Sequence, residues 1–296
     1  MSLRVGTRGS KLALAQTSIV CKKLIAHGIN TEQVIITTQG DTSTGVPLHE
    51  IGGQGVFVRA LDDAILAGDI DCAVHSMKDI PAYRPSGIVT AAVLNRDSPA
   101  DYLAYKGALH AVKVIGTSST RRRAQMLRHD PEITTKDLRG NVDTRIRKMS
   151  AGHYDAILVA EAGLTRLGIR IPGERLSPER FVPAPNQGTI AVVSRADPCL
   201  MEELSVLDHP RTRTDVAIER AVMEKLGGGC FTPLGIYCQG GHLIAEVLSL
   251  DGTRTERLET DVQTIEQARD EGIKLHALAK DLIDDAYRKL GITHER

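Results

Sequence analysis

The chain has 296 residues, of which 42% are hydrophobic and 25% charged, a composition typical of a globular protein with about two or three domains. Lys and Arg total 37, Asp and Glu also total 37, and the formal net charge is zero. With this balance, only 3% aromatic residues and no Trp, a general nucleic-acid-binding surface is not expected. Any anion site therefore requires cations that are concentrated locally.

The cysteines and histidines show no metal-binding or disulfide pattern. The five cysteines include no CxxC pair and are odd in number, and the ten histidines include no HExxH motif. No apolar stretch approaches ~18 residues, and no signal-peptide apolar region is present. We therefore expect no metal, no membrane segment and a reducing, cytoplasmic location.

The first region alternates short apolar runs with helical patterns, which predicts a parallel βαβ sheet. Strands are expected at residues 3–6, 34–38, 72–74 and 89–94. Ser10 is expected to cap a helix with Leu12, Ala15 and Ile19 on one face. Arg8 and Ser10 beside this helix N-terminus would form a natural anion site.

The strand expected at 72–74 is followed at once by polar residues, which include Ser76, Lys78 and Asp79. Pro81 prevents regular structure beyond them. The strand end would therefore present a hydroxyl, an ammonium and a carboxylate together, and ligands of α/β sheets bind at such ends. The alternative is a solvated turn with a local Lys–Asp pair.

A second α/β region is expected after the polar break at 95–99, with strands at 112–115 and 156–160. Three consecutive arginines, Arg121 to Arg123, fall in the first turn of its first helix and oppose the helix dipole. An anion bound by the turn amides and the arginines would resolve this conflict. The alternative is a basic helix face in water. Arg139 and Arg145 repeat the pattern around the next helix.

The strand at 190–194 is expected to return to the first domain, so that two α/β lobes joined by two crossing segments would enclose a cleft. A third, small α+β region follows. Its antiparallel strands, expected at 236–239, 243–249 and 254–259, are separated by Gly240-Gly241 and Asp251-Gly252, which are good hairpin turns. A final helix is expected to bury one apolar face consisting of Leu275, Leu278, Ala279, Leu282, Ile283, Ala286 and Leu290.

Cys230 follows three consecutive glycines, which remove side-chain bulk and allow unusual backbone angles. Such a loop could expose a thiol to a large electrophile, and a thiolate is a good nucleophile. The alternative is a small buried apolar residue at a helix end, as most free cysteines are.

A series of motifs in fixed order covers nearly the whole chain. They are Gly6-Thr7-Arg8-Gly9-Ser10, Gly53-Gln54-Gly55 with Phe57, His75-Ser76-Met77-Lys78-Asp79-Ile80-Pro81, Gly116-Thr117-Ser118-Ser119, Arg121-Arg122, Leu138-Arg139-Gly140-Asn141-Val142 with Thr144-Arg145, Pro185-Asn186-Gln187-Gly188 and Gly228-Gly229-Cys230. With these motifs the chain resembles the hydroxymethylbilane synthases, also called porphobilinogen deaminases.

The resemblance implies an α/β fold with two periplasmic-binding-protein-like domains and a small α+β domain with an antiparallel sheet. Domain 1 would comprise residues 1–95 and 188–207, domain 2 residues 96–187, and domain 3 residues 212–296. It also implies a monomeric, cytoplasmic transferase of haem and tetrapyrrole biosynthesis. Such an enzyme condenses four porphobilinogen molecules head to tail, with loss of ammonia, and releases the linear tetrapyrrole by hydrolysis. The alternative is a two-lobed anion- or solute-binding protein without catalysis.

The resemblance also assigns roles to residues. A dipyrromethane cofactor would be attached to Cys230 by a thioether and would prime the growing polypyrrole chain. Asp79 and Lys78 would be catalytic. The implied cofactor-binding residues are Cys230, Ser76, Lys78, Asp79, Thr117, Ser118, Ser119, Arg121, Arg122, Gly140 and Arg145. The implied substrate-binding residues are Arg8, Ser10, Phe57, Arg139, Arg145 and Gln187.

These roles suit the chemistry, because a carboxylate that accepts pyrrole N–H bonds stabilises developing positive charge, and arginine binds the acetate and propionate groups of each pyrrole. The chain departs from the family pattern at Gln54, where many relatives have Lys, at Phe231-Thr232, and at Asp143 between two arginines. These departures concern substrate-loop details.

Overall fold

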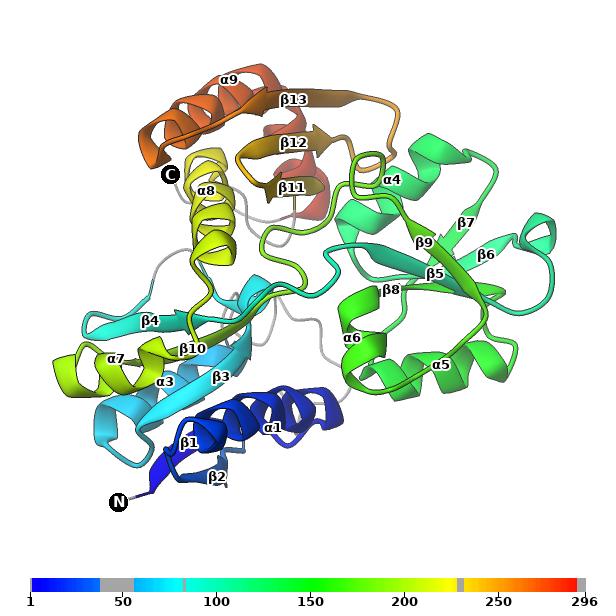
Figure 1. Ribbon diagram of the computed structural model, residues 1–296. Helices are drawn as coiled ribbons and strands as arrows, with labels where there is room; N and C mark the ends of the chain where they lie inside the picture. Colours follow the sequence, from blue (N-terminus) through cyan, green and yellow to red (C-terminus); the bar gives the residue numbers. More distant parts are fainter. Residues whose placement is uncertain (1, 38–55, 82–83, 228–231, 292–296) are drawn as a thin grey trace. The chain divides into compact units, whose positions relative to one another are not determined.

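The computed structural model describes residues 2–37, 56–81, 84–227 and 232–291 (Figure 1). The chain divides into two compact units, of which the first comprises Met1–Asp97 with Gly188–Arg213 and the second Ser98–Gln187 with Thr214–Arg296. The finer division of the second unit into domains 2 and 3 stays a prediction. In the described part, no helix is long and apolar enough to cross a membrane.

The first unit contains a five-stranded mixed sheet in the order β2-β1-β3-β10-β4. The strands are β1 (Leu3–Thr7), β2 (Thr31–Ile35), β3 (Cys72–Ser76), β4 (Ile88–Val93) and β10 (Ile190–Arg195). The first three pair in parallel, whereas β10 pairs antiparallel with both β3 and β4. The all-parallel expectation is therefore wrong for this edge, because the chain enters β10 from the second unit and not through a crossover helix that would impose a parallel direction.

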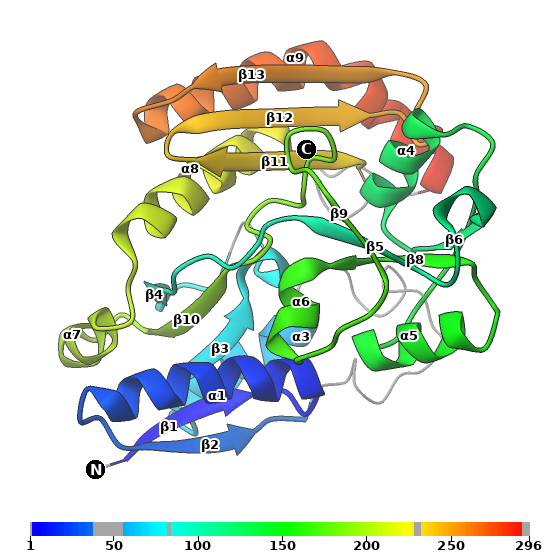
Figure 2. The ribbon, with the colours of Figure 1, turned by 45° about the vertical axis from the view of Figure 1, so that its right-hand side comes forward.

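Three helices of the first unit have described bounds, α1 (Lys11–Ala26), α3 (Val56–Ala67) and α7 (Pro198–Ser205). The cap at Ser10 is confirmed. The face with Leu12, Ala15 and Ile19 is partly buried, and the fully buried residues of α1 are Gln16, Thr17, Val20, Cys21 and Leu24. The helix carries apolar residues around much of its circumference, so spacing alone did not single out the face that packs on β1 and β3. Figure 2 shows α1 lying along these strands.

The second unit contains another five-stranded mixed sheet, in the order β7-β6-β8-β5-β9. Its strands are β5 (Asp101–Tyr105), β6 (Val114–Gly116), β7 (Thr134–Lys136), β8 (Ala156–Ala160) and β9 (Gly173–Leu176). β6 is parallel to β7 and β8, whereas β5 is antiparallel to β8 and β9. Ala156 and Leu158 join one apolar cluster and Ile157 and Val159 another, as expected for a sheet covered on both faces.

The helices of this sheet are α4 (Thr120–His129), α5 (Val142–Ser150) and α6 (Glu161–Arg166), with a short 3₁₀ helix, η2 (Leu109–Ala111), before β6. Met126 of α4 packs in the first of the two apolar clusters, and Met149 of α5 and Leu164 of α6 pack in the second. The sheet is therefore a three-layer α/β arrangement, with α4 on one face and α5 and α6 on the other.

The C-terminal part is an antiparallel sheet of β11 (Leu234–Gln239), β12 (His242–Leu248) and β13 (Thr255–Asp261), which is confirmed. Gly240 and Gly241 form its first turn with φ angles of 60° and 87°, which residues with a Cβ rarely adopt. The helices α8 (Pro210–Leu226) and α9 (Ile265–Leu290) contribute side chains to the apolar cluster of this sheet.

The helix α9 begins with a capping box formed by Thr264 and Gln267. Its expected apolar face is partly wrong, since Leu278 is 64% exposed and Leu290 39% exposed. The small residues Ala268 and Gly272 are buried instead. A Cβ at Gly272 would lie 2.8 Å from Lys225 Cβ, so close helix approach determines which face is covered.

The small sheet contacts α4 directly within the second unit. Glu246 of β12 is fully buried and accepts from Arg128 of α4, with Nη1 2.9 Å from its Oε2, and from Arg257 of β13 at 3.4 Å. Gly252, in the turn between β12 and β13, lies so close to α4 that a Cβ there would be 2.3 Å from the Ala124 carbonyl oxygen. Both the turn and the ion pairs thus fix α4 against this sheet.

Candidate functional site

The first group of predicted site residues lies at one edge of the first sheet. β1 and β3 are neighbouring parallel strands, paired at Val5–Cys72, so their carboxyl ends lie at the same edge. Arg8 and Ser10 follow β1, and Ser76 ends β3. Ser10 Oγ accepts from the Ala13 N–H at 3.3 Å and caps α1.

Lys78 and Asp79 lie in a short 3₁₀ helix, η1 (Met77–Asp79), directly after β3, and both are exposed. Gln16 of α1 donates from Nε2 to Ser76 Oγ at 2.8 Å, which fixes the end of β3 against α1. The structure therefore brings Arg8, Ser10, Ser76, Lys78 and Asp79 to one sheet edge, which carries two cations, two hydroxyls and a carboxylate.

Asp62 and His75 of the first unit are buried, and Arg84 is only slightly exposed; Asp62 and Arg84 had no predicted role. Asp62 of α3 and Arg84 form an ion pair with little exposure. Burial, followed by the charges of Arg84 and Arg8, lowers the pKa of His75 to about 3. His75 is therefore neutral near pH 7 and adds no positive charge to the edge.

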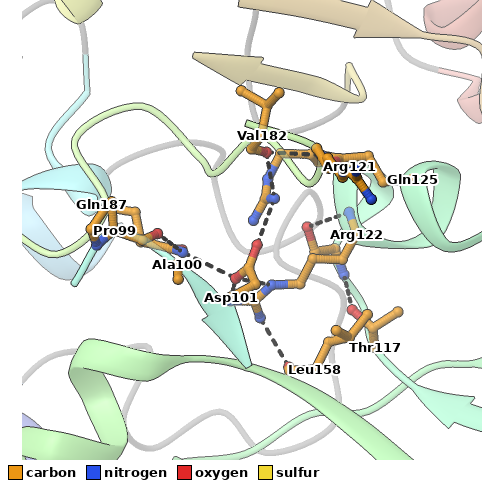
Figure 3. Close-up of polar contacts among 12 residues, drawn as sticks. Pro99, Ala100, Asp101, Thr117, Arg121, Arg122, Gln125, Leu158, Val182 and Gln187 are labelled. Carbon is orange, nitrogen blue, oxygen red and sulfur yellow. Dashed lines mark hydrogen bonds and ion pairs between the residues drawn. The ribbon is translucent and has the colours of Figure 1, made fainter. Parts of the chain in front are cut away.

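The second group is buried and centres on Asp101, the first residue of β5 (Figure 3). Arg121 Nη1 donates to Asp101 Oδ2 at 2.7 Å, and Arg122 donates to Asp101 Oδ1 from Nη2 at 2.6 Å and from Nε at 2.9 Å. The remaining contacts go to carbonyl oxygens, from Arg121 to Val182 at 2.9 Å and from Arg122 to Leu158 at 3.0 Å.

This arrangement explains how arginines in the first turn of α4 are tolerated although they oppose the helix dipole. Burial raises the pKa of Asp101, but the charges of Arg121 and Arg122 outweigh it, so the pKa lies well below its usual range. Two guanidinium groups and one carboxylate leave one net positive charge in the buried cluster. Asp101 is thus an internal anion for both arginines in the described structure. The positive charge that remains on the cluster favours a second anion nearby.

Gln187, predicted to bind substrate, is buried in this cluster. Its Nε2 donates to the Pro99 carbonyl at 2.8 Å and to Asp101 Oδ1 at 3.0 Å (Figure 3). The residue before it, Asn186, has a positive φ of 63°, and its N–H donates to the buried Glu219 carboxylate at 2.5 Å. Gln187 therefore orients Asp101 and joins the two chain segments that begin and end this sheet domain.

The hydroxyl groups of the predicted turn before α4 have contacts of their own. Thr117 Oγ1 accepts from the Ser119 N–H at 3.2 Å, and Ser119 Oγ accepts from the Arg122 N–H at 3.4 Å as the cap of α4. Ser118 Oγ bonds both the N–H and the carbonyl of Leu138, each at 3.0 Å. Thr117 is buried, whereas Ser118 is exposed.

Arg139, Gly140 and Arg145 lie around the start of α5. Gly140 has a φ of 115°, and its carbonyl accepts from Arg145 Nε at 2.7 Å. Arg139 is exposed and Arg145 partly buried. Asp143 lies in the first turn of α5, where a negative charge favours the helix dipole.

Some predicted site residues lie outside the description. Cys230 and Phe231 belong to the segment 228–231, and Gln54 to 38–55, both outside the described residues. Phe57 lies in α3, but its side chain is also outside the description. Asp101 and Glu219 were missed by sequence reasoning, and the only signal was a charged residue within an apolar pattern.

Two family models match this chain. Residues 3–203 match "Porphobilinogen deaminase, dipyromethane cofactor binding domain", and residues 214–281 match "Porphobilinogen deaminase, C-terminal domain".

Among similar proteins, the "Probable porphobilinogen deaminase" of Methanosarcina acetivorans is 51% identical over 286 residues, covering 92% of this chain and 90% of the relative. The "Porphobilinogen deaminase" of Rubrobacter xylanophilus is 45% identical over 260 residues, covering 84% and 85%. A solved periplasmic substrate-binding protein from Coxiella burnetii has a TM-score of 0.43 and 16% identity, covering 74% of this chain and 96% of that chain, a likeness too small to support an argument. The chain therefore belongs to the porphobilinogen deaminase family, transferases of tetrapyrrole biosynthesis with a dipyrromethane cofactor.

Proposed function

We propose that this chain adds four porphobilinogen molecules head to tail to a dipyrromethane primer attached through the thioether of Cys230, and then releases the linear tetrapyrrole hydroxymethylbilane with water. The observation that supports this most is the exposed carboxylate of Asp79, next to Lys78 and at the sheet edge that also carries Arg8. This edge offers charge of both signs to one small substrate.

Asp79 is proposed as the group that stabilises positive charge. Loss of ammonia from porphobilinogen leaves an electron-poor pyrrole that is cationic when protonated, and its N–H can donate to the Asp79 carboxylate. An oriented negative charge beside a developing positive charge is often the largest catalytic contribution. Lys78 and Arg8 are proposed to bind the acetate and propionate groups, with Ser10 and the N-terminus of α1 beside them.

The second unit has residues that fit a polycarboxylate cofactor. The partly exposed N-terminus of α4 and Arg145 supply donors, while Ser118 orders the turn before α4 through its two bonds to Leu138. The buried Asp101–Arg121–Arg122 cluster adds one net positive charge. We therefore propose that Arg121 and Arg122 act toward the cofactor mainly through this charge and by ordering α4. When bound, the dipyrromethane supplies the nucleophilic pyrrole carbon to which each substrate unit is joined.

Other proposed roles follow the same chemistry. Gly140 allows the turn that orients Arg145, and Arg139 is an exposed cation available to the acids of the growing chain. Ser76 and Gln187 are proposed to act by positioning their neighbours, since their side chains bond Gln16 and Asp101 respectively. We further propose a monomer in a reducing cytoplasm, where the buried free thiols of Cys21, Cys72 and Cys238 are stable.

Intact-mass measurement of the purified protein tests the proposal directly. We expect added mass equal to two linked pyrroles, and loss of that mass in the Cys230→Ala variant. The Cys199→Ala variant, which removes an exposed thiol, is the control and should keep the added mass. An unmodified wild-type mass, or added mass that survives Cys230→Ala, would contradict the proposed attachment. Light scattering of the same sample at several concentrations tests the monomer.

A further inference from the structure

The ion pair between Asp62 and Arg84 joins a helix of the first unit to the segment that follows the exposed Lys78 and Asp79. Asp62 lies in α3, which packs against β3 and β4, and its side chain is 3% exposed. Arg84 lies between η1 and β4, and its side chain is 9% exposed. Its Nη2 donates to Asp62 Oδ1. The pair therefore attaches this segment to α3.

Stability alone gives no reason for this pair. Arg84 Nε and Nη1 are buried, and they have no hydrogen-bond partner within residues 2–37, 56–81, 84–227 and 232–291. Burial raises the pKa of Asp62 and lowers the pKa of Arg84, and the charge of each partner opposes the shift of the other. Apolar side chains of similar volume often replace a buried ion pair without loss of stability. The value of such a pair lies in the position that it fixes, because a buried guanidinium has to stay beside its carboxylate.

The turn η1 is attached to the sheet on its other side. The Met77 N–H donates to the carbonyl of Thr189 at 2.9 Å, and the Ile80 N–H donates to the Met77 carbonyl at 3.1 Å. Met77 and Ile80 are buried, whereas Lys78 and Asp79 between them are exposed. Asp79 thus lies between a backbone bond to the sheet before it and the bond from Arg84 to α3 after it.

The pair also lies near the end of β3, the strand that leads into η1. His75 of β3 is 6% exposed, and burial, the charge of Arg84 and the charge of Arg8 lower its pKa. Coulombic effects decrease with distance, so Arg84 is close to this strand end. Asp62 neutralises Arg84, and the pair therefore adds no net charge there. Its effect on a reaction at this edge is one of position.

From this attachment on both sides of the turn, we propose that Asp62 and Arg84 are positioning residues for the reaction, which hold η1 so that the Asp79 carboxylate faces the substrate. The inference rests on the role proposed above for Asp79. Asp62 and Arg84 act through the chain that connects Arg84 to Asp79, and not by contact with the substrate. A displacement of about 1 Å at a catalytic group can lower a rate by up to about 100-fold, so a small shift of η1 is sufficient.

A double-mutant cycle in the full-length enzyme tests this proposal. The variant Asp62→Leu with Arg84→Met replaces the pair by apolar side chains and leaves the net charge unchanged, so it should stay folded, as urea denaturation would verify. We expect turnover of porphobilinogen to fall by about tenfold when Asp79 is present. In the Asp79→Asn background, the same change should lower turnover by less than about twofold, because the group that the pair positions is already lost. Equal factors in the two backgrounds would overturn the proposal.

Two further variants separate position from a general effect on the fold. Arg4→Met with Asp71→Leu is the matched control, because it removes the ion pair next to the start of β3, and it should change turnover by less than about twofold. Arg84→Lys keeps a cation for Asp62, which Arg84 contacts through one nitrogen, so turnover should stay within about threefold of wild type. A loss in either variant as large as that of the Asp62–Arg84 variant would contradict the proposal.

NMR of ¹³C-methyl methionines reports on the turn independently of catalysis. Met77 is the first residue of η1, whereas Met126 lies in the second unit. We expect the Met77 methyl signal to shift in the Asp62–Arg84 variant and to stay in place in the Arg4–Asp71 control, with Met126 unchanged in both. An unmoved Met77 signal would overturn the positioning role alone. Near-normal turnover of Asp79→Asn would instead contradict the proposed function.

Discussion

The two units use ionic groups in opposite ways. At the edge of the first sheet, Lys78 and Asp79 are exposed, and nothing in their burial restricts access by a ligand. In the second unit, Asp101 is fully buried between Arg121 and Arg122. The difference separates two tasks. Exposed charges can contact a substrate that arrives and leaves, whereas a buried cluster provides a fixed field and a fixed helix position.

The largest effect should come from breaking the buried cluster. Asp101→Asn removes the only carboxylate that the structure shows on Arg121 and Arg122 in the described residues, and leaves two buried guanidinium groups. We expect the free energy of unfolding to fall by about 3–5 kcal/mol, measured by urea denaturation. Asp137→Asn is the control, because its pair with Arg123 is exposed, and it should change stability by less than about 1 kcal/mol. Similar losses of stability in both variants would contradict the proposed difference between the buried cluster and the exposed ion pair.

The exposed Asp79 of the first unit should behave in the opposite way, with a large effect on turnover and a small effect on stability. Asp79→Asn should lower the turnover of porphobilinogen by about 100-fold or more, since it removes the negative charge, yet change the free energy of unfolding by only about 0.5 kcal/mol. Bilane formation and urea denaturation would be measured on the same sample. Asp63→Asn, on the exposed side of α3, should alter neither. Near-normal turnover would remove Asp79 from its proposed role.

A third carboxylate lies between these extremes. Glu246 is buried, but its partners Arg128 and Arg257 are each 30% exposed and keep access to water. Glu246→Gln should therefore lower the free energy of unfolding by about 2 kcal/mol, less than Asp101→Asn. Glu256→Gln on the neighbouring strand is the control. A loss equal to that of Asp101→Asn would show that the exposure of the arginines does not matter.

The smallest effect, when measured per pH unit, concerns His75. Burial, Arg84 and Arg8 lower its pKa from 6.5 to about 3, so the unfolded chain binds an additional proton between these values. The stability that comes from the neutral imidazole is complete above about pH 6.5 and is lost as pH falls toward 3, by about 1 kcal/mol per pH unit. His75→Gln should flatten the stability profile between pH 6 and 4. His153→Gln, at an exposed site, should leave the slope unchanged, and an unaltered slope in His75→Gln would refute this account.

Sequence alone predicted the elements whose signal is local. β8 was predicted at residues 156–160 with correct bounds because it is a continuous apolar run, and the Gly240-Gly241 turn because few residues adopt its φ angles. The strand β5 was missed, since it begins with a charged residue, Asp101, whose partners lie about twenty residues further along the chain. The group that a buried arginine contacts depends on the tertiary structure, and the spacing of residues in the sequence does not reveal it.

The same limit applies to the candidate site. The order of the motifs gave the family, and the strand end at Ser76 gave the exposed edge. The sequence predicted an anion for the arginines at the start of α4, but an aspartate of the protein itself could not be distinguished from a bound ligand. Likewise, Gln187 was expected to bind substrate, whereas in the described residues its amide holds Asp101 and Pro99.

The close approach of Gly252 to α4 has a mechanical consequence. Gly252 has a φ of 73° and no room for a side chain, because a Cβ there would lie only 2.3 Å from the Ala124 carbonyl oxygen. The tip of the hairpin therefore packs directly against the backbone of α4. The turn at Gly252 thus contacts the middle of α4, the helix whose first turn holds Arg121 and Arg122, although it lies more than a hundred residues further along the chain. A larger residue at this position would push the hairpin away from α4, and we expect that change to disturb the bonds that Arg121 and Arg122 make with Asp101.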